Sequence, residues 1–493
     1  MTSLTDTRLS QSLEENLNLL KEELGYGISF DVLVREFQIA DKDAALVFLD
    51  GFAKDEAITE ILKALFRADR SEIRPNTVGR VIREHLPYLE IETAGTYSQV
   101  IEQILAGPAV LLIDGEADAI IIDSRTYPGR GSEEPDLERV TRGSRDGFVE
   151  TIIFNVALIR RRVRDPRLRV QIAQVGRRAR TDMGILYIKD IANPQLVQKT
   201  VDRIKSIQVD AVTMGEKTVE EFLIPRRQRW NPFPLVRYTE RPDVAAQHLF
   251  EGHVVVVVDT SPSAIILPVT LFHHLEHAEE YRQAPTVGAY LWLVRLLGIL
   301  ISWIGPPLWV YLAQHQEQLP AGLRFLGPDK VGEIPLVWQF VLVELGIDLI
   351  RMALIHTPNA LATSLGFIGA ILLGDMAVEV GLLARETIIY VSLAALGTFA
   401  TPSLEFGLAV RLVRLVLLAA VGLAGGIGLA VAAGLILLVL MVSRSFGVPY
   451  LWPLIPLNLK ALATILIRRP VPTRFSRPSI LRPQDPDLRP GGK

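Results

Sequence analysis

Cysteine is absent from this chain of 493 residues. Its absence excludes a disulfide framework, a cysteine nucleophile and any metal site built on thiolates. Net charge is also scarce, because 52 basic and 55 acidic residues leave a formal charge of −3. Such a balance is not typical of a nucleic-acid-binding protein, and we expect no nucleic-acid partner. The first 30 residues lack the apolar core of a signal peptide, so we expect the amino-terminal part to stay in the cytosol.

Charge is sparse in one long region, residues 287–443, in which Leu, Ala, Val, Ile and Gly predominate. Residues 288–311 carry a single charge, Arg295, and are longer than the roughly 20 apolar residues that a bilayer core requires. A soluble protein does not bury so long a region with so few charges. The sequence therefore predicts membrane-spanning helices in this region.

The number of spans depends on how the rest of this region divides. Further apolar stretches occupy residues 361–383, 387–401 and 412–443, whereas the charges within 334–355 leave that stretch ambiguous. The stretch 412–443 is predicted to break into two spans, or into a span and a re-entrant piece, at Gly422, Gly425, Gly426 and Gly428. The tail from Arg444 carries nine basic and two acidic residues, which favours a cytosolic carboxyl terminus. With both termini cytosolic, the number of full spans is even, four or six.

The charged part of the chain contains an internal repeat. Residues 100–123 resemble residues 244–268, and each stretch predicts a helix, a glycine stop, a strand, a turn and a second strand. Residues 43–66 likewise resemble residues 182–207, and each predicts a strand followed by an amphipathic helix. The matched positions are Gly107 with Gly252, Asp114 with Asp259, and Asp50 with Asp190. Their nearly constant spacing predicts two tandem modules, each with a small mixed sheet.

We therefore expect an α/β cytosolic region of two tandem similar modules followed by an α-helical transmembrane domain. The predicted divisions are a helical or flexible segment at 1–27, a first module at 28–125, a connector at 126–144, a second module at 145–284, a transmembrane domain of four to six spans at 285–443, and a basic, proline-rich tail at 444–493. Two similar modules favour a binding or assembly platform over a single catalytic pocket.

The connector and the start of the second module are rich in arginine, with nine arginines and one acid within residues 158–180. One interpretation is a solvated helix end, where cations meet the negative end of the helix dipole. Anionic lipid headgroups or nucleic acid are a second, although no aromatic residues interleave the arginines for base stacking. The third is a subunit interface of bidentate pairs, for which the candidates are Glu134, Glu138, Arg142, Arg145, Arg160, Arg161 and Arg162.

The same connection resembles the signature of the spore germinant-receptor A-subunit family, the GerA family. The matching residues are Glu134-Pro135, Glu138, Arg142-Gly143-Ser144-Arg145-Asp146-Gly147-Phe148, Glu150, Asn155 and Leu158-Ile159-Arg160-Arg161-Arg162, and further matches follow at Phe233-Pro234, Glu240-Arg241-Pro242-Asp243 and Ser445-Phe446-Gly447-Val448-Pro449-Tyr450. Ser144 replaces a proline that is usual in the family, and Asp146 a frequent glutamate. The resemblance extends over nearly the whole chain.

The resemblance implies a multi-pass protein of the spore inner membrane that acts in germination, in a homo-oligomer whose pore releases ions. It also implies other spore membrane germination proteins as partners, including a small membrane partner. The basic tail suits the anionic cytosolic leaflet, so we expect contact with anionic lipids. The alternative is a nutrient-sensing receptor subunit whose soluble half binds a small molecule or partner without conducting by itself.

Charged residues in the apolar half are candidates for an ion path, because each is costly inside a membrane. Glu344 and Asp348 lie four residues apart and share one face of a helix, and Asp375 and Glu379 repeat this spacing. Arg351 follows Asp348 by three residues. Carboxylates repeated by oligomer symmetry would suit a cation path. The alternative is interfacial residues or internal ion pairs with Arg351, Arg411 or Arg414.

Motifs for catalysis are missing from the sequence. It contains no P-loop, no dinucleotide-binding fingerprint and no nucleophile elbow, and we predict no catalytic residues and no cofactor. His273 and His277 have the i, i+4 spacing of a metal pair, but His274 stands where the HExxH motif has glutamate. We therefore expect a structural role for these histidines and no metal site. An ion-conducting oligomer, a ligand-sensing subunit and a membrane-bound enzyme or transporter remain as classes.

Overall fold

The computed structural model describes residues 7–53, 55–70, 76–86, 90–125, 138–355, 366, 369, 371, 376–467, 473 and 476–488. The chain divides into two compact units, which we describe separately. The α/β unit comprises Met1–Pro225, Tyr238–Pro268 and Val471–Lys493, and the helical unit comprises Arg226–Arg237 and Val269–Pro470.

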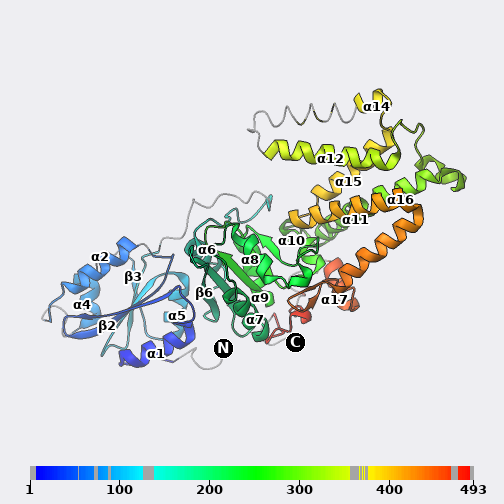
Figure 1. Cartoon of the computed structure of the whole chain (residues 1–493). Helices are drawn as coiled ribbons and strands as arrows, with labels where there is room; N and C mark the ends of the chain where they lie inside the picture. Colours follow the sequence, from blue (N-terminus) through cyan, green and yellow to red (C-terminus); the bar gives the residue numbers. More distant parts are fainter. Residues whose placement is uncertain are drawn as a thin grey trace. The chain divides into compact units, whose positions relative to one another are not determined.

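The first module of the α/β unit is a five-stranded sheet in the order β1-β2-β4-β5-β3, and each neighbouring pair of strands is antiparallel. Its elements are α1 (Leu13–Leu24), β1 (Val32–Ile39), β2 (Lys42–Leu49), α2 (Asp55–Phe66), α4 (Thr77–Arg80), the π-helix η1 (Val81–His85), β3 (Ile91–Ala94), α5 (Tyr97–Ala106), β4 (Ala109–Ile113) and β5 (Ala119–Ile122). Helices cover both faces of the sheet (Figure 1).

Neighbouring residues of the sheet point to opposite faces, and each face has its own core. Val47 belongs to the core under α1 and α5, whereas Leu46 belongs to the core under α2 and η1. Four leucines of α1 are buried in the first of these cores: Leu13, Leu17, Leu20 and Leu24. Residues before position 28 therefore contribute a helix to the first module.

The second module repeats this arrangement, with the sheet order β6-β7-β9-β10-β8. Its elements are α6 (Ile152–Arg160), β6 (Leu168–Val175), β7 (Thr181–Ile188), α7 (Pro194–Lys205), α8 (Gly215–Leu223), β8 (Arg237–Thr239), α9 (Pro242–Glu251), β9 (Val254–Val258) and β10 (Ala264–Leu267). Helices α6 and α9 pack together, as do α7 and α8. The predicted repeat of helices and strands is confirmed, but the prediction of mixed sheets is wrong. The neighbouring pairs β6–β7, β7–β9 and β9–β10 are all antiparallel.

Two kinds of side-chain hydrogen bond occur at equivalent places in both modules. The carboxylates of Asp114 and Asp259 accept from the first backbone N–H of α1 and of α6, each at 3.1 Å. The side-chain amides of Asn16 and Asn155 close the loop before the same two helices. Each amide accepts from the backbone N–H, and donates to the backbone carbonyl, of the residue six positions earlier. The modules therefore share their hydrogen bonds as well as their strand order.

The end of the chain docks on the second module of the α/β unit. Gln484 donates from its backbone N–H to Ile191 and from its side chain to Lys189 and Ala192, at 2.7–2.9 Å. Arg477 donates to the carbonyl of Phe250 at 2.7 Å. Residues 476–488 of the predicted tail are thus held by specific hydrogen bonds.

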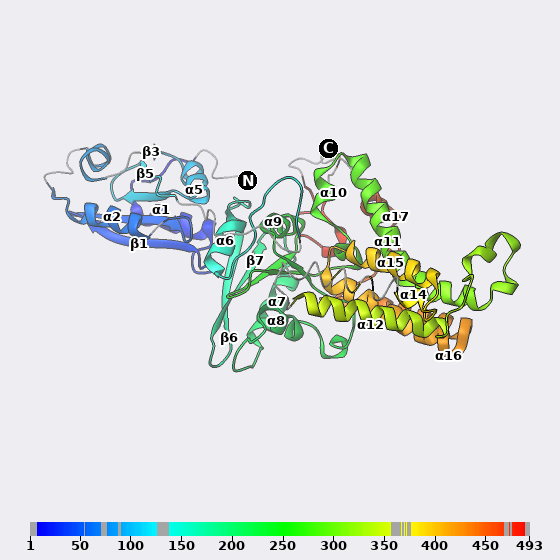
Figure 2. The same ribbon diagram turned by 90° about the horizontal axis from the view of Figure 1, so that it is seen from above.

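The helical unit contains the apolar half of the sequence. Its elements are η2 (Arg226–Gln228), η3 (Leu271–His274), α10 (Ala278–Arg282), α11 (Pro285–Gln314), η4 (Gln316–Gln318), η5 (Ala321–Leu326), α12 (Leu336–Ile355), α14 (Ala377–Glu379), α15 (Arg385–Phe399), α16 (Leu404–Val442), β11 (Arg444–Ser445), β12 (Val448–Pro449) and α17 (Leu459–Leu466). Helices α11, α15 and α16 lie side by side (Figures 1 and 2).

Two helices within the described residues are long and apolar enough to cross a membrane, α11 and α16. Helix α12 has 20 residues but carries Glu344, Asp348 and Arg351, and α15 has only 15 residues. The predicted span at 361–383 lies largely outside the described residues. The number of spans, four or six, therefore stays a prediction.

Helix α16 is broken where its sequence is rich in glycine. Ala424 and Gly425 have non-helical backbone angles, and Gly425 has φ 57° and ψ −136°, a conformation that is essentially restricted to glycine. Ser403, which caps the start of α16, lies 3.3 Å from the ring of His274, and Tyr450, just beyond the end of α16, has its ring centroid 6.0 Å from the same ring. Both ends of α16 therefore meet at one place, and α16 is a bent hairpin of two helices, as the glycines predict.

Candidate functional site

The most unusual feature of the helical unit is a cluster of charged side chains between its apolar helices. Glu344 of α12 is 1% exposed and accepts from Arg411 of α16 at 2.9 Å. A second arginine of α16, Arg414, lies 2.7 Å from the other carboxylate oxygen of Glu344. Asp348 pairs with Arg411. We call Glu344, Asp348, Arg411 and Arg414 the charge cluster, and its two carboxylates balance its two guanidinium groups.

Arg414 also connects the charge cluster to the other long helices. It donates to the carbonyl and to the hydroxyl of Ser302 in α11, both at 2.7 Å. The hydroxyl of Ser302 lies 2.8 Å from that of Thr398 in α15. Polar groups of four helices, α11, α12, α15 and α16, thus meet in one network, where low polarity makes each partner hard to replace.

The helices approach closely next to this network. Gly298 of α11 faces Gly397 of α15, and a methyl group on Gly397 would overlap the backbone carbonyl of Gly298. Glycines allow such close helix contact in membrane proteins. Gly397 therefore packs closely against α11.

The predicted ion-path residues have different environments. Glu344 and Asp348 pair with arginines of α16, which is the internal ion-pair arrangement that the sequence left open. Asp348 is the more accessible, with 33% of its side chain exposed, and Arg351 is half-buried one turn further along α12. Glu379 is exposed and lines a groove of about 780 Å³ with Arg385 of α15. Asp375 lies outside the described residues.

Arg411 and Arg414 are partners that the sequence offers as alternatives, whereas nothing in the sequence singles out Ser302 and Thr398. Single hydroxyl groups are common in apolar helices, where they bond to the preceding turn, so their sequence contains no signal of a shared network. Gln339 was also missed. Its buried side chain accepts from the N–H of Ala384 and from the hydroxyl of Thr387, and so it holds the start of α15.

The predicted interface residues of the connector are partly internal. Arg160 forms a bidentate pair with Asp31 of the first module at 2.7 and 3.1 Å, and both side chains are 2% exposed. Glu138 accepts from the hydroxyl of Thr239 and from the N–H of Glu240. Both residues therefore hold the α/β unit together from within.

The remaining connector residues lie nearer the surface. Arg162 binds Asp146 at 2.6 Å. Burial raises the pKa of the Asp146 carboxyl, but its bonds with Arg162 and Ser144 outweigh this and hold the pKa below its usual value. The side chains of Arg142, Arg145 and Arg161 are exposed, and their role as a subunit interface stays a prediction. Glu134 lies outside the described residues.

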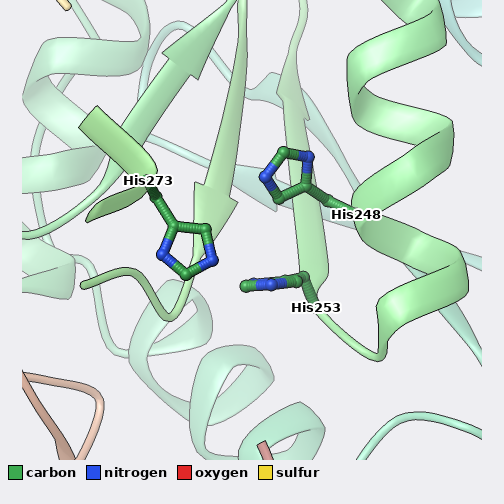
Figure 3. Close-up of side chains that lie close together, drawn as sticks. All are labelled: His248, His253 and His273. Carbon is green, nitrogen blue, oxygen red and sulfur yellow. The ribbon is translucent and has the colours of Figure 1, made fainter. Parts of the chain in front are cut away.

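Several histidines contact groups of their own unit, and their structural role stays a prediction. In the second module, His248 and His253 lie with ring centroids 5.0 Å apart (Figure 3). In the helical unit, the ring of His273 accepts from the backbone N–H of Thr270 at 3.1 Å. His274 stacks on Phe406, and its burial, assisted by the nearby charge of Arg237, lowers its pKa to about 3. His274 is therefore neutral at physiological pH.

Comparisons with known proteins agree with the resemblance seen in the sequence. Residues 18–480 match the family described as Bacillus/Clostridium GerA spore germination protein. Stage V sporulation protein AF of Bacillus subtilis (strain 168) is 47% identical over 97% of each chain, and the uncharacterized membrane protein YfkQ of the same organism is 28% identical over 96% of this chain and 92% of its own. The crystal structure of the N-terminal domain of the A subunit of the Bacillus megaterium spore germinant receptor GerK3 matches 54% of this chain and 96% of that one, with 28% identity and a TM-score of 0.42.

Proposed function

The chain belongs to the Bacillus/Clostridium GerA family of spore germination proteins, and we propose that it forms an oligomeric channel that passes cations through the spore inner membrane during germination. In this proposal α11, α16 and further helices span the bilayer, and both termini lie in the cytosol. The α/β unit is the cytosolic head through which other germination proteins act on the channel.

The charge cluster is the observation that carries this proposal. Charged side chains inside apolar helices are costly, and in membrane proteins they typically mark ion or proton paths. Glu344 is enclosed by two arginines, whereas Asp348 keeps a third of its side chain exposed. Repeated around an oligomer axis, Asp348 would present a ring of carboxylates to a passing cation. The enclosed Glu344 would hold that ring in place.

Ion flux from liposomes tests the proposal. The purified protein, alone and together with its membrane partners, should release a trapped monovalent cation, and Asp348→Asn should change the rate or the ion preference. Glu405→Gln, which neutralises an acid in the first turn of α16 away from the charge cluster, is the matched control and should leave both unchanged. Absence of flux under all these conditions, from protein that is folded and inserted, would contradict the proposal.

The alternative function is that of a receptor subunit that binds a nutrient or a partner through its α/β unit and does not itself conduct. It is favoured by the size of that unit. A ligand that binds only the folded protein raises its melting temperature. A shift of the melting temperature with one compound of a nutrient panel, in protein that never conducts, would select this alternative.

A further inference from the structure

A short loop of the helical unit, Arg226–Trp230, combines three arginines with an exposed tryptophan. The side chains of Arg226, Arg227 and Arg229 are exposed, and Trp230 is 97% exposed. The ring of tryptophan is apolar with a polar N–H at its edge, and it suits a boundary between apolar and polar surroundings. The loop therefore presents an apolar ring and three positive charges at one place.

Hydrogen bonds fix this loop to the end of α16. The side chain of Asn231 donates to the hydroxyl of Ser443 at 2.7 Å. The amide of Gln228, in the orientation that satisfies both of its groups, donates to the carbonyl of Arg444 at 2.8 Å and accepts from its N–H at 3.2 Å. Ser443 and Arg444 are the first residues after α16. Trp230 is therefore held at the level where α16 ends.

The surface of α16 changes character at the same level. Val439, Met441 and Val442 of its last turn expose apolar side chains, and the exposed Arg444 follows directly. The backbone N–H of Tyr450 donates to the carbonyl of Ser443 at 3.0 Å. From there the chain continues into a segment without charge up to Lys460, in which Leu454, Leu457 and Leu459 are exposed. Exposed apolar side chains and positive charge thus occur together around the end of α16.

We propose that the loop Arg226–Trp230 is an anchor that binds the surface of an anionic bilayer at the end of α16. The ring of Trp230 lies at the headgroup level, the position that tryptophan prefers in membrane proteins. Arg226, Arg227 and Arg229 bind phosphates of anionic lipids, for which the planar guanidinium is suited. The anchor rests on the proposed insertion of α16 into the bilayer, and it fixes the depth of that helix.

The absence of native cysteine makes a direct test possible in the full-length protein. Trp230→Cys, Val439→Cys and Met214→Cys each create a single site for a nitroxide spin label, in α16 for Val439 and on the exposed surface of the α/β unit for Met214. The labelled proteins are inserted into phosphatidylcholine vesicles with and without phosphatidylglycerol. Collision rates with oxygen, which is enriched in the bilayer, and with a water-soluble nickel complex report the depth of each label.

We expect the label at position 230 to collide with nickel several-fold less often than the label at position 214, and its burial to increase with phosphatidylglycerol. The triple change Arg226→Gln, Arg227→Gln and Arg229→Gln should abolish the dependence on phosphatidylglycerol. A matched triple change in exposed arginines of the α/β unit, Arg177→Gln, Arg178→Gln and Arg180→Gln, should leave it unchanged. Quenching of native Trp230 by brominated lipids, taken as the difference from Trp230→Phe, should agree.

The label at position 439 separates this proposal from the proposed function. If it collides mainly with oxygen while the label at 230 behaves like that at 214, α16 is inserted and the anchor is refuted. If the label at 439 is itself open to nickel, the insertion of α16 fails, and with it the proposed channel. A label at 230 that is shielded from both reagents in vesicles and in detergent would mean that a protein covers the loop, which also refutes a lipid anchor.

Discussion

Both units bury charged side chains, but they do so in different ways. In the α/β unit Asp31 and Arg160 form one closed pair, bidentate and 2% exposed on both sides. In the helical unit Glu344 is shared by two arginines, and the second carboxylate, Asp348, is partly open. A closed pair has one favourable arrangement, whereas a shared carboxylate allows an arginine to exchange partners. The Asp31–Arg160 pair is thus closed on both sides, whereas in the charge cluster one carboxylate serves two arginines.

The largest effect is expected from Glu344→Gln, because it leaves two arginines without their common anion among apolar helices. Breaking a buried pair in this way costs about 3–5 kcal/mol. Thermal unfolding of the detergent-solubilised Glu344→Gln protein should show a large loss of stability. Asp348→Asn should lose much less stability, since Arg411 keeps its ion pair with Glu344. Equal losses in the two variants would mean that the two carboxylates are energetically equivalent.

Asp31→Asn should cost about 3 kcal/mol in the α/β unit, because it leaves one buried guanidinium unpaired instead of two. Hydrogen exchange should accelerate around Ser29 and Val170, which hydrogen bond across the two modules. The double variant Asp31→Asn, Arg160→Gln, compared with both single variants, measures the coupling between the two side chains. If the double variant is as stable as the wild type, the pair serves specificity rather than stability.

His274 predicts a loss of stability in acid. Its pKa of about 3 in the folded chain lies below the ordinary value of 6.5, so the unfolded chain binds more protons between these values. The contribution of neutral His274 to the free energy of unfolding is complete above pH 6.5 and falls by about 2 kcal/mol by pH 5. His274→Phe should flatten the pH dependence of the melting temperature in this window. An unchanged slope would assign the acid sensitivity to other groups.

The two modules can be compared with one another through their matched asparagines. Asn16→Ala and Asn155→Ala each remove a side chain that accepts from and donates to one loop residue, and each should cost about 1–2 kcal/mol. Hydrogen exchange should locate the first loss at α1 and the second at α6. A loss of stability in only one of the two variants would mean that the two asparagines have the same hydrogen-bond geometry but contribute unequally to stability.

The smallest effect is expected from Arg477→Ala, which removes the bond between the docked tail and Phe250. We expect about 1 kcal/mol, because Gln484 keeps its three bonds to the second module. Limited proteolysis should then cut the tail faster than in the wild type, and Arg482→Ala is the control from the same segment. Equal rates in the two variants would contradict a specific role for Arg477.

Much of the fold follows from local patterns. The repeat of helices and strands, the stops at Gly107 and Gly252, and the apolar helices were all predictable, because hydrophobic spacing and glycine act over a few residues. The break in α16 at Ala424 and Gly425 belongs to the same class. The direction of the strands was not predictable in this way, since pairing joins segments that are distant in the sequence.

The sequence by itself determined which residues are charged within apolar surroundings and where the chain repeats. Only the tertiary structure decided their partners. Arg160 finds Asp31 across 129 residues, and Arg411 finds Glu344 across 67. The physical reason is that a charge in a region of low polarity must be paired, while the identity of the partner depends on which helices and loops the fold brings together. In the same way, the sequence contains Trp230, but the bonds of its loop to Ser443 and Arg444 put it at the end of α16.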